Sequence, residues 1–264
     1  MQMNTAAVND RRTHEGAQAS AINAEQELRR SVMACMLWES EFYEGGVTIA
    51  ERIESLVPHV KPETVAAIAV DAREKSHLRH APLWLVRAMA ASAKHRPFVR
   101  KTLARVIQRA DELSEFCALY AIGRTGPKVL NKLAKQVQKG LAAAFGKFNA
   151  YGLAKYNRDT EIKLRDVLFL CHAKPKDAEQ AALWKSLVDG TLPTPDTWEV
   201  ALSAGKDKKL TWERLISENK LGGLAMLRNL RNMQEAGVEA QWVKAGLQQM
   251  DASKVLPFRF IAAA

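Results

Sequence analysis

Apolar residues recur at spacings of three and four along most of the chain, and sustained alternation of period two is hard to find. A spacing of three and four places side chains on one face of an α-helix. The pattern therefore predicts an all-α protein. Helices are predicted near residues 20–38, 46–56, 62–76, 81–94, 97–109, 111–121, 127–148, 150–157, 161–171, 178–189, 195–203, 207–233 with a break, and 238–250.

Prolines at the starts of several predicted helices support this division. Pro62, Pro82, Pro97 and Pro127 lie where the first helical turn tolerates a missing N–H, and Thr194 followed by Pro195 has the order of an N-cap and first helical residue. Many short helices joined by short turns predict HEAT- or armadillo-like helical repeats, in a superhelix or an incomplete ring. An irregular helical bundle is the alternative, because no clean repeat of fixed period is visible.

The segment 127–148 predicts a helix with one apolar and one basic face. Its apolar stripe comprises Leu130, Leu133, Val137, Leu141, Phe145 and Phe148, and Lys128, Lys132, Lys135 and Lys139 lie on the opposite side. A lysine face kept for solubility is the plain alternative. Against it, no Asp or Glu occurs between Lys128 and Lys147, although surface helices usually intersperse acidic partners.

Residues 96–109 repeat this arrangement in a shorter form. Val99, Leu103, Val106 and Ile107 are apolar, whereas Arg100, Lys101, Arg105 and Arg109 are basic. Two basic helical faces favour a surface that binds phosphate.

Charge is distributed unevenly along the 264 residues, whose formal net charge is +10. Residues 73–109 contain ten basic and one acidic residue, and residues 128–176 contain eleven basic and three acidic ones. Residues 177–264 contain eleven of each. The attraction to polyanions is therefore expected from the two central segments.

Composition narrows the class of protein further. With 47% hydrophobic residues, the chain is expected to be a folded globular protein, and the polar N-terminus without an apolar stretch predicts a cytoplasmic protein with no membrane association. Cys35, Cys117 and Cys171 lack any Cys-x-x-Cys spacing, so we expect three reduced thiols, no metal and no cofactor. No nucleophile or metal-hydrolase motif stands out, which argues against an enzyme.

Three stretches resemble the TROVE domain of the Ro autoantigen (Ro ribonucleoprotein) family: residues 151–158 (YGLAKYNR), 165–175 (RDVLFLCHAKP) and 227–233 (LRNLRNM). Further resemblance lies in residues 41–44 (EFYE) with 52–53 (RI), in 78–83 (LRHAPL) and in 192–203 (LPTPDTWEVALS). The match runs from about Trp38 to Phe260. It predicts one TROVE-like RNA-binding domain over residues 21–264, after a polar, flexible segment over residues 1–20.

The resemblance implies a non-catalytic RNA-binding protein of a ribonucleoprotein. In the family, helical repeats bend into a ring whose hole takes single-stranded 3′ ends of misfolded RNAs, and whose outer basic surface binds small stem-loop Y RNAs. A ribonuclease is a second partner that the family allows. Full-length Ro proteins also carry a von Willebrand A-type domain with an Asp-x-Ser-x-Ser metal loop; residues 251–254 (DASK) hold only half of that pattern, so this domain and its metal are expected to be absent.

The resemblance also implies which residues contact RNA. Lys155 and His172 match positions in the Lys-Tyr and Leu-x-His-x-Lys-Pro motifs that contact RNA in the family. The further candidates are Arg165, Lys139, Lys174, Lys135, Lys132 and Arg158.

Each of these residues also has a plainer interpretation. A histidine that closes an apolar helix is often a cap or a core group, and a single lysine is often only a surface residue. Arg228 and Asn229, set among leucines, fit a buried role in hydrogen bonding to carbonyls of neighbouring repeats as well as RNA contact. Tyr151, Tyr156 and Trp84 could stack on bases, but aromatic residues at helical spacing usually belong to a core. A protein-binding helical scaffold and an inactive truncated copy of the domain are the alternatives for the whole chain.

Overall fold

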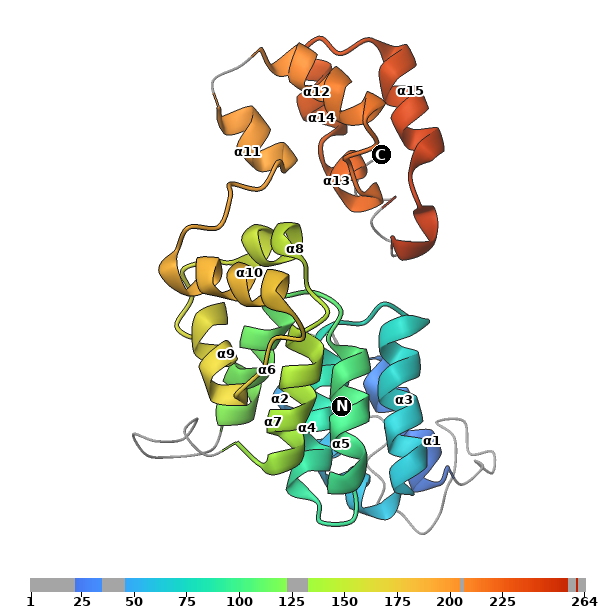
Figure 1. The fold of residues 1–264 in the computed structure, drawn as a ribbon. Helices are drawn as coiled ribbons and strands as arrows, with labels where there is room; N and C mark the ends of the chain where they lie inside the picture. Colours follow the sequence, from blue (N-terminus) through green and yellow to red (C-terminus); the bar gives the residue numbers. More distant parts are fainter. Residues whose placement is uncertain (1–21, 35–45, 123–132, 205–206, 256–259, 261–264) are drawn as a thin grey trace, which may run out of the picture. The chain divides into compact units, whose positions relative to one another are not determined.

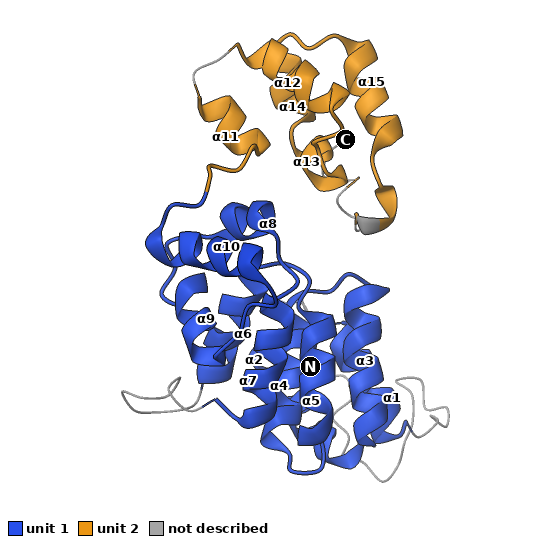
Figure 2. Cartoon of the chain, in the orientation of Figure 1, with its two compact units in different colours: residues 1–192 blue, residues 193–264 orange. Residues whose placement is uncertain are grey.

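The computed structural model describes residues 22–34, 46–122, 133–204, 207–255 and 260. In those ranges the regular structure is helical and no strand occurs. Contacts divide the chain into two compact units, unit 1 over residues 1–192 and unit 2 over residues 193–264 (Figure 2). The predicted all-α class is confirmed. The single domain over residues 21–264 stays a prediction, and the segment 1–20 lies outside the described residues.

Unit 1 is a two-layered stack of helices. Helices α3, α5 and α7 pack side by side in one layer, and α2, α4 and α6 pack side by side in the other (Figure 1). This alternation is the arrangement of HEAT-like repeats that the sequence predicts. The helices are α1 (Ala24–Met33), α2 (Gly46–Leu56), α3 (Pro62–Glu74), α4 (His80–Ala91), α5 (Arg96–Val106), α6 (Asp111–Ala121), α7 (Lys135–Phe145), α8 (Ala150–Tyr156), α9 (Leu164–Cys171) and α10 (Ala178–Asp189), with a 3₁₀ turn at Val57–His59.

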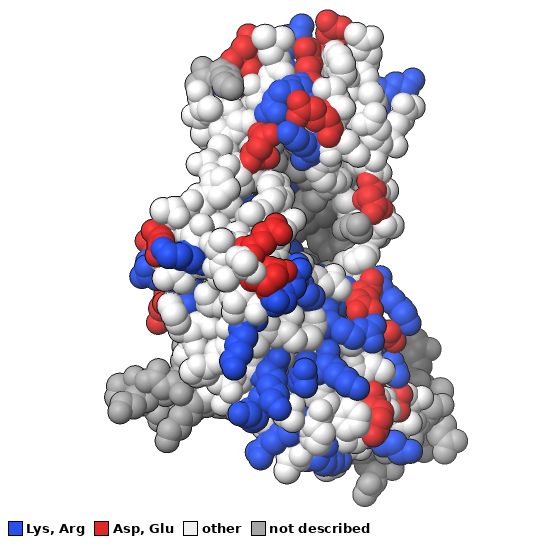
Figure 3. All heavy atoms as spheres, viewed as in Figure 1, with Lys and Arg blue, Asp and Glu red and all other residues white. Residues whose placement is uncertain are grey.

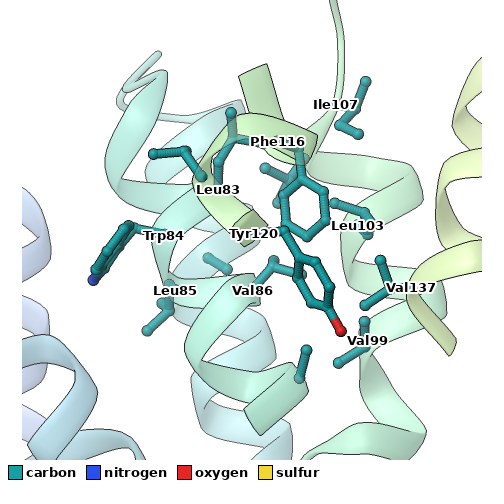
Figure 4. Packing of buried hydrophobic residues seen from close by; sticks show 14 of the residues in the cluster. Leu83, Trp84, Leu85, Val86, Val99, Leu103, Ile107, Phe116, Tyr120 and Val137 are labelled. Atoms are coloured by element: carbon teal, nitrogen blue, oxygen red, sulfur yellow. The ribbon is translucent and has the colours of Figure 1, made fainter. Parts of the chain in front are cut away.

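The core of unit 1 lies between the two layers (Figure 4). Leu103 of α5, Phe116 and Tyr120 of α6 and Val137 of α7 are buried together there. These are the apolar positions that recur at helical spacing in the sequence. Burying one such side chain contributes about 1.5–3 kcal/mol, so the shared stripe holds the layers together.

Unit 2 has its own, smaller core. It comprises α11 (Trp198–Ser203), α12 (Lys208–Ser217), α13 (Gly223–Arg228), α14 (Leu230–Glu235), α15 (Ala240–Gln249) and a 3₁₀ turn at Ala252–Lys254. Trp212, Leu215, Met226 and Met233 are buried, and Trp198 stacks on Trp212 with ring centroids 5.9 Å apart. The long segment predicted as one broken helix is therefore three short ones, α12 to α14.

The predicted helix 127–148 is not continuous, and the predicted cap of the helix at 195–203 is wrong. Residues 133–134 precede α7 in non-helical conformation, so that helix begins at Lys135; the earlier part of the predicted helix 127–148 lies outside the described residues. The cap of α11 is Thr197, not Thr194, because the Thr197 hydroxyl oxygen accepts from Val200 N at 3.3 Å. Asp196, just before it, is instead bound by Arg214 and Lys220.

No helix in the described ranges combines the length and apolar character needed to cross a membrane.

Candidate nucleic-acid interface

The closest helix pairing near the predicted basic residues is between α5 and α7, and Gly140 makes it possible. A Cβ atom at residue 140 would lie 3.0 Å from Leu103 Cβ and 3.2 Å from the Arg100 carbonyl oxygen. Lys147, further along, donates at 2.5 Å to the carbonyls of Ala104 and Ile107, which end α5. Helices α5 and α7 are therefore parallel and in close contact, and their outer faces adjoin.

Four cations lie exposed on those outer faces: Arg100 and Lys101 on α5, and Lys135 and Lys139 on α7. We call them the α5–α7 basic surface. Within the described part of the chain, none of the four has an ion pair or a hydrogen bond. Acidic residues are also missing from the sequence around them, between Glu74 and Asp111 and between Glu115 and Asp159. Figure 3 shows Lys and Arg side chains gathered over this part of unit 1.

The other two basic residues predicted for the face at residues 96–109 do not join the surface. Arg105 forms a two-point ion pair with Glu74, its Nη2 lying 2.6 Å from Glu74 Oε2. Arg109 follows the end of α5 and pairs with Asp111 at 2.7 Å. The prediction failed for Arg105 because its acidic partner comes from α3, far away in the sequence. For Arg109, the partner Asp111 is only two residues later and was visible in the local sequence.

The loop after α9 runs beside α7. Gln138 Nε2 donates to the Leu170 carbonyl at 3.5 Å, and Gln180 Nε2 donates to the Gly146 carbonyl at 3.1 Å. The segment between Leu170 and Gln180 therefore follows α7 along residues 138–146. It carries His172 and Lys174, so the structure brings these two candidates next to the helix that bears Lys139.

His172 ends α9 in a left-handed conformation, with φ 50° and ψ 42°. Its backbone N–H donates to the Phe169 carbonyl at 3.2 Å, so the backbone closes the helix and the interpretation as a cap is correct. Its side chain is exposed, which excludes a core group. Lys174 is exposed as well. Both side chains are thus accessible to a ligand.

Lys155 lies at the end of α8 among aromatic rings. Its Nζ is 5.6 Å from the Tyr151 ring centroid and 5.7 Å from that of Tyr156. The guanidinium of Arg109 also lies over Tyr156, at 4.7 Å. Cation–π contacts of this kind hold the half-buried lysine in place. Tyr156 is therefore covered by two cations, whereas Tyr151 remains 48% exposed.

The remaining candidates are dispersed. Arg158 is exposed and lines a cavity of about 220 Å³ together with Asp111, Glu115 and Glu161, so its surroundings are mixed in charge. Arg165 is exposed in the first turn of α9, with its Nε 3.8 Å from Asp166 Oδ1. Lys132 lies outside the described residues.

The two candidates from unit 2, Asn229 and Arg228, differ in burial. Asn229 is buried, as the sequence allows, but its side chain donates to the Ala225 carbonyl at 2.8 Å, four residues earlier and not in a neighbouring repeat, and accepts from Asn232 at 2.8 Å. Arg228 is exposed.

Sequence reasoning missed Phe169, which lies on α9 with 60% of its surface exposed. Two signals were present in the sequence. Phe169 is four residues after Arg165 and three before His172, and it lies off the stripe of Leu164, Leu168 and Cys171 that α9 buries. Trp84, named as a possible stacking residue, is buried and donates to the Ala50 carbonyl at 3.1 Å, so it belongs to the core.

The thiols of Cys117 and Cys171 are not activated as nucleophiles. Burial raises the pKa of Cys117 to about 12 and that of Cys171 to about 11, so both remain protonated at neutral pH. Cys35 lies outside the described residues. No cluster of His, Cys, Asp or Glu that could hold a metal ion occurs in the described ranges.

Comparisons with known proteins agree with this architecture. The family model described as the TROVE domain matches residues 13–189 and 181–264. A crystal structure of the Deinococcus radiodurans RO (RSR) protein superposes with a TM-score of 0.50 at 19% identity, covering 87% of this chain and 47% of that one, which shows a common fold.

Two curated proteins share a shorter stretch with the chain. The telomerase protein component 1 of Mus musculus is 40% identical over 78 residues, and that of Rattus norvegicus is 38% identical over 78 residues. The match covers 27% of this chain and only 3% of each of those proteins. Because the family model matches nearly the whole sequence, this chain belongs to the TROVE domain family.

Proposed function

We propose that this protein binds RNA, without catalysing a reaction on it, through the α5–α7 basic surface of unit 1 and the adjoining segment of His172 and Lys174. The observation that carries this proposal is the group of four exposed cations without acidic partners on two closely packed helices. Membership of the TROVE domain family supports it, because that family consists of RNA-binding domains of ribonucleoproteins.

The physical basis is release of counterions. Lys and Arg that meet phosphates displace the cations condensed on the nucleic acid, and the entropy gained drives binding. Unpaired side chains suit this role, because they need not break an ion pair within the protein before they contact a phosphate. Backbone phosphates would fix the position of the RNA, and His172 could donate to a phosphate or contact an unpaired base.

The ligands of this surface are small structured RNAs of the Y type and RNAs with single-stranded 3′ ends. Lys155, Arg165 and Arg158, on α8, on α9 and in the loop between them, would extend the contact beyond the α5–α7 basic surface. A ribonuclease is a further partner of such a ribonucleoprotein. These assignments rest on the resemblance of residues 151–158 and 165–175 to the Ro motifs.

The test is a binding titration over a salt series. A fluorescent stem-loop RNA with a single-stranded tail is compared with a duplex DNA of equal length. Four phosphate contacts predict a slope of log affinity against log salt of about −3, because each contact contributes roughly 0.7 to 0.9. Tight, salt-dependent binding that prefers the tailed RNA is expected. No binding at low salt would contradict RNA binding and favour a protein-binding scaffold or an inactive copy of the domain.

A further inference from the structure

Helix α9 presents an aromatic ring between basic groups on its outer side. Arg165, Phe169 and His172 are spaced by four and three residues, which places them on one arc of the helix. All three are exposed, whereas Leu164, Val167, Leu168 and Cys171 are buried on the remaining side. The helix thus has a buried apolar side and a separate outer stripe.

Phe169 is an unusual residue for such a position. With 60% of its surface exposed, the ring forgoes most of the roughly 1.5–3 kcal/mol that burying a phenylalanine contributes. Within the described ranges, no other ring and no cation lies against it. Tyr151, also exposed, differs in this respect, because the Nζ of Lys155 lies 5.6 Å from its ring centroid. The face of Phe169 is therefore open to a ligand.

The charges around the ring indicate the chemistry of that ligand. Arg165 and His172 flank Phe169 on the helix, and Lys174 follows on the segment that runs along α7. Asp166, the acid next to Arg165 in the sequence, accepts at Oδ2 from Lys163 N at 2.9 Å, and its Oδ1 lies 3.8 Å from Arg165 Nε. A protein partner held by apolar contact would need a wider apolar patch than one ring. A nucleotide with a flat base and an anionic phosphate matches one ring between cations.

We propose that Phe169 is a stacking platform for an unpaired base of the bound RNA, with Arg165, His172 and Lys174 placed to meet the phosphates on either side. This inference rests on the proposed RNA binding and deepens it, because it assigns a stacking contact with a base to a named side chain. Stacking accepts every base, so the platform would select unpaired nucleotides over paired ones without reading their sequence.

The test uses the full chain, four proteins and three RNAs. The proteins are the wild type, Phe169→Ala, Phe169→Trp and the control Leu210→Ala, which removes an equally exposed apolar side chain (64%) from α12 of unit 2. The RNAs are a stem-loop with an unpaired uridine tail, the same RNA with abasic tail residues, and the blunt stem-loop. Thermal unfolding of each variant checks that the fold is kept, as expected for an exposed side chain.

The expected result is a loss confined to unpaired bases. Phe169→Ala lowers affinity for the uridine tail by about 5- to 160-fold, the range that alanine substitution of a stacking residue gives, while Phe169→Trp keeps it. The slope against log salt stays unchanged, because no phosphate contact is removed. Phe169→Ala binds the uridine and abasic tails equally, and Leu210→Ala behaves as the wild type.

Three outcomes would overturn the inference. If Phe169→Ala binds the tailed RNA as tightly as the wild type, stacking is excluded and the proposed RNA binding stands. An equal loss of affinity for the tailed and blunt RNAs would show that the ring acts on something other than unpaired bases. If the wild type binds none of the three RNAs, the proposed function itself fails, and the stacking platform with it.

Discussion

The two units of this protein differ in how deeply their ion-paired carboxylates are buried. In unit 1, Glu112 is buried and binds Arg73 at 2.5 Å, and Asp111 binds Arg79 and Arg109 at 2.7 Å each. In unit 2, the corresponding pairs are on the outside. Arg214 and Lys220 bind Asp196 at 3.2 and 2.5 Å, and Arg231 pairs with Glu235 at 2.9 Å on an exposed helix face.

This difference helps to explain why the described part of unit 1 carries the α5–α7 basic surface. Unit 1 uses some of its acidic side chains for an internal network that joins α3 to the start of α6, so these cannot neutralise the cations on α5 and α7. Residues 177–264, which comprise the end of unit 1 and all of unit 2, contain eleven basic and eleven acidic residues. In unit 2, several of these residues form ion pairs at the surface. A patch that attracts phosphate thus depends on where the acids lie as well as on how many cations there are.

The largest effect is expected from breaking the internal network. Arg73→Ala removes the side chain that donates to Glu112 Oε1 and leaves the buried carboxylate with two backbone N–H donors, from Gln108 and Arg109, and with Arg79 Nε 3.9 Å from its Oε1. Removing one member of a buried ion pair typically costs about 3–5 kcal/mol. Amide hydrogen exchange of α3, α5 and α6, measured over a urea series, should show this loss as a lower free energy of unfolding for the three helices.

The matched control is an exposed pair of unit 2. Arg231→Ala removes an ion pair whose arginine side chain is 89% exposed, and such helical pairs contribute less than about 0.5 kcal/mol. Equal losses of unfolding free energy in the two variants would refute the division into internal and external carboxylates.

Two helical glycines allow a second comparison. An alanine Cβ at Gly140 would meet Leu103 Cβ and the Arg100 carbonyl, which cannot move without shifting α5. At Gly246 it would meet the end of the flexible Met226 side chain, with Cε at 2.8 Å. We expect Gly140→Ala to destabilise unit 1 by about 1–3 kcal/mol and to weaken RNA binding.

Gly246→Ala is expected to change stability by less than about 1 kcal/mol, since the gain in helix propensity offsets a small side-chain shift. Urea denaturation of both variants, followed by RNA titration, measures the contrast. A neutral effect at Gly140 would mean that the close approach of α5 and α7 does not hold the basic surface in place.

A smaller difference is expected in the response to acid. Burial, together with Arg79 and Arg109, lowers the pKa of His80 in unit 1 to about 4, whereas the unfolded chain titrates near 6.5. His80 is thus neutral in the fold, and its contribution to stability is complete above pH 6.5 and lost as the pH falls to 4. The side chains of Arg214 and Lys220 lower the pKa of Asp196 in unit 2 to about 2, so its contribution is complete above pH 3.8 and is lost towards pH 2.

Between pH 6.5 and 4, the protection of amides from hydrogen exchange, relative to the intrinsic rate at each pH, should therefore fall in α4 and α6 and stay constant in α12. His80→Gln is the control, because it should remove that pH dependence. A folded His80 that titrates near 6.5 by NMR would contradict the assigned cause.

The helices were predictable because their signals are local. Apolar spacing and prolines such as Pro62 and Pro97, in the first two positions of α3 and α5, identify helices close to those observed. The start of α11 was not predictable from Thr194 and Pro195, because the cap is Thr197, whose hydroxyl oxygen accepts from Val200 N, while Asp196 pairs with Arg214 and Lys220 from distant positions in the sequence. The division into two units also depends on contacts that no local pattern reports.

The candidate surface was predictable only in part. The exposed Lys135 and Lys139 follow from helical periodicity, and the position of His172 follows from its motif. The pairing of Arg105 with Glu74 and the position of residues 172–174 beside α7 depend on tertiary contacts, so sequence alone could not separate paired from unpaired cations. The exposure of Phe169 could have been predicted from its place on α9, off the apolar stripe.

The most direct test of the central claim is a comparison of two charge reversals. Lys135→Glu with Lys139→Glu changes the α5–α7 basic surface, and Lys208→Glu with Lys244→Glu makes the same charge change at exposed positions of unit 2. Binding of the tailed stem-loop RNA is measured over a salt series for both variants and the wild type. We predict that the unit 1 variant loses affinity and that its slope against log salt falls by roughly 1.5 to 2, since two phosphate contacts are lost. The unit 2 variant should keep a slope close to that of the wild type. Equal effects in both variants would contradict the account, because they would show that net charge, and not the α5–α7 basic surface, binds the RNA.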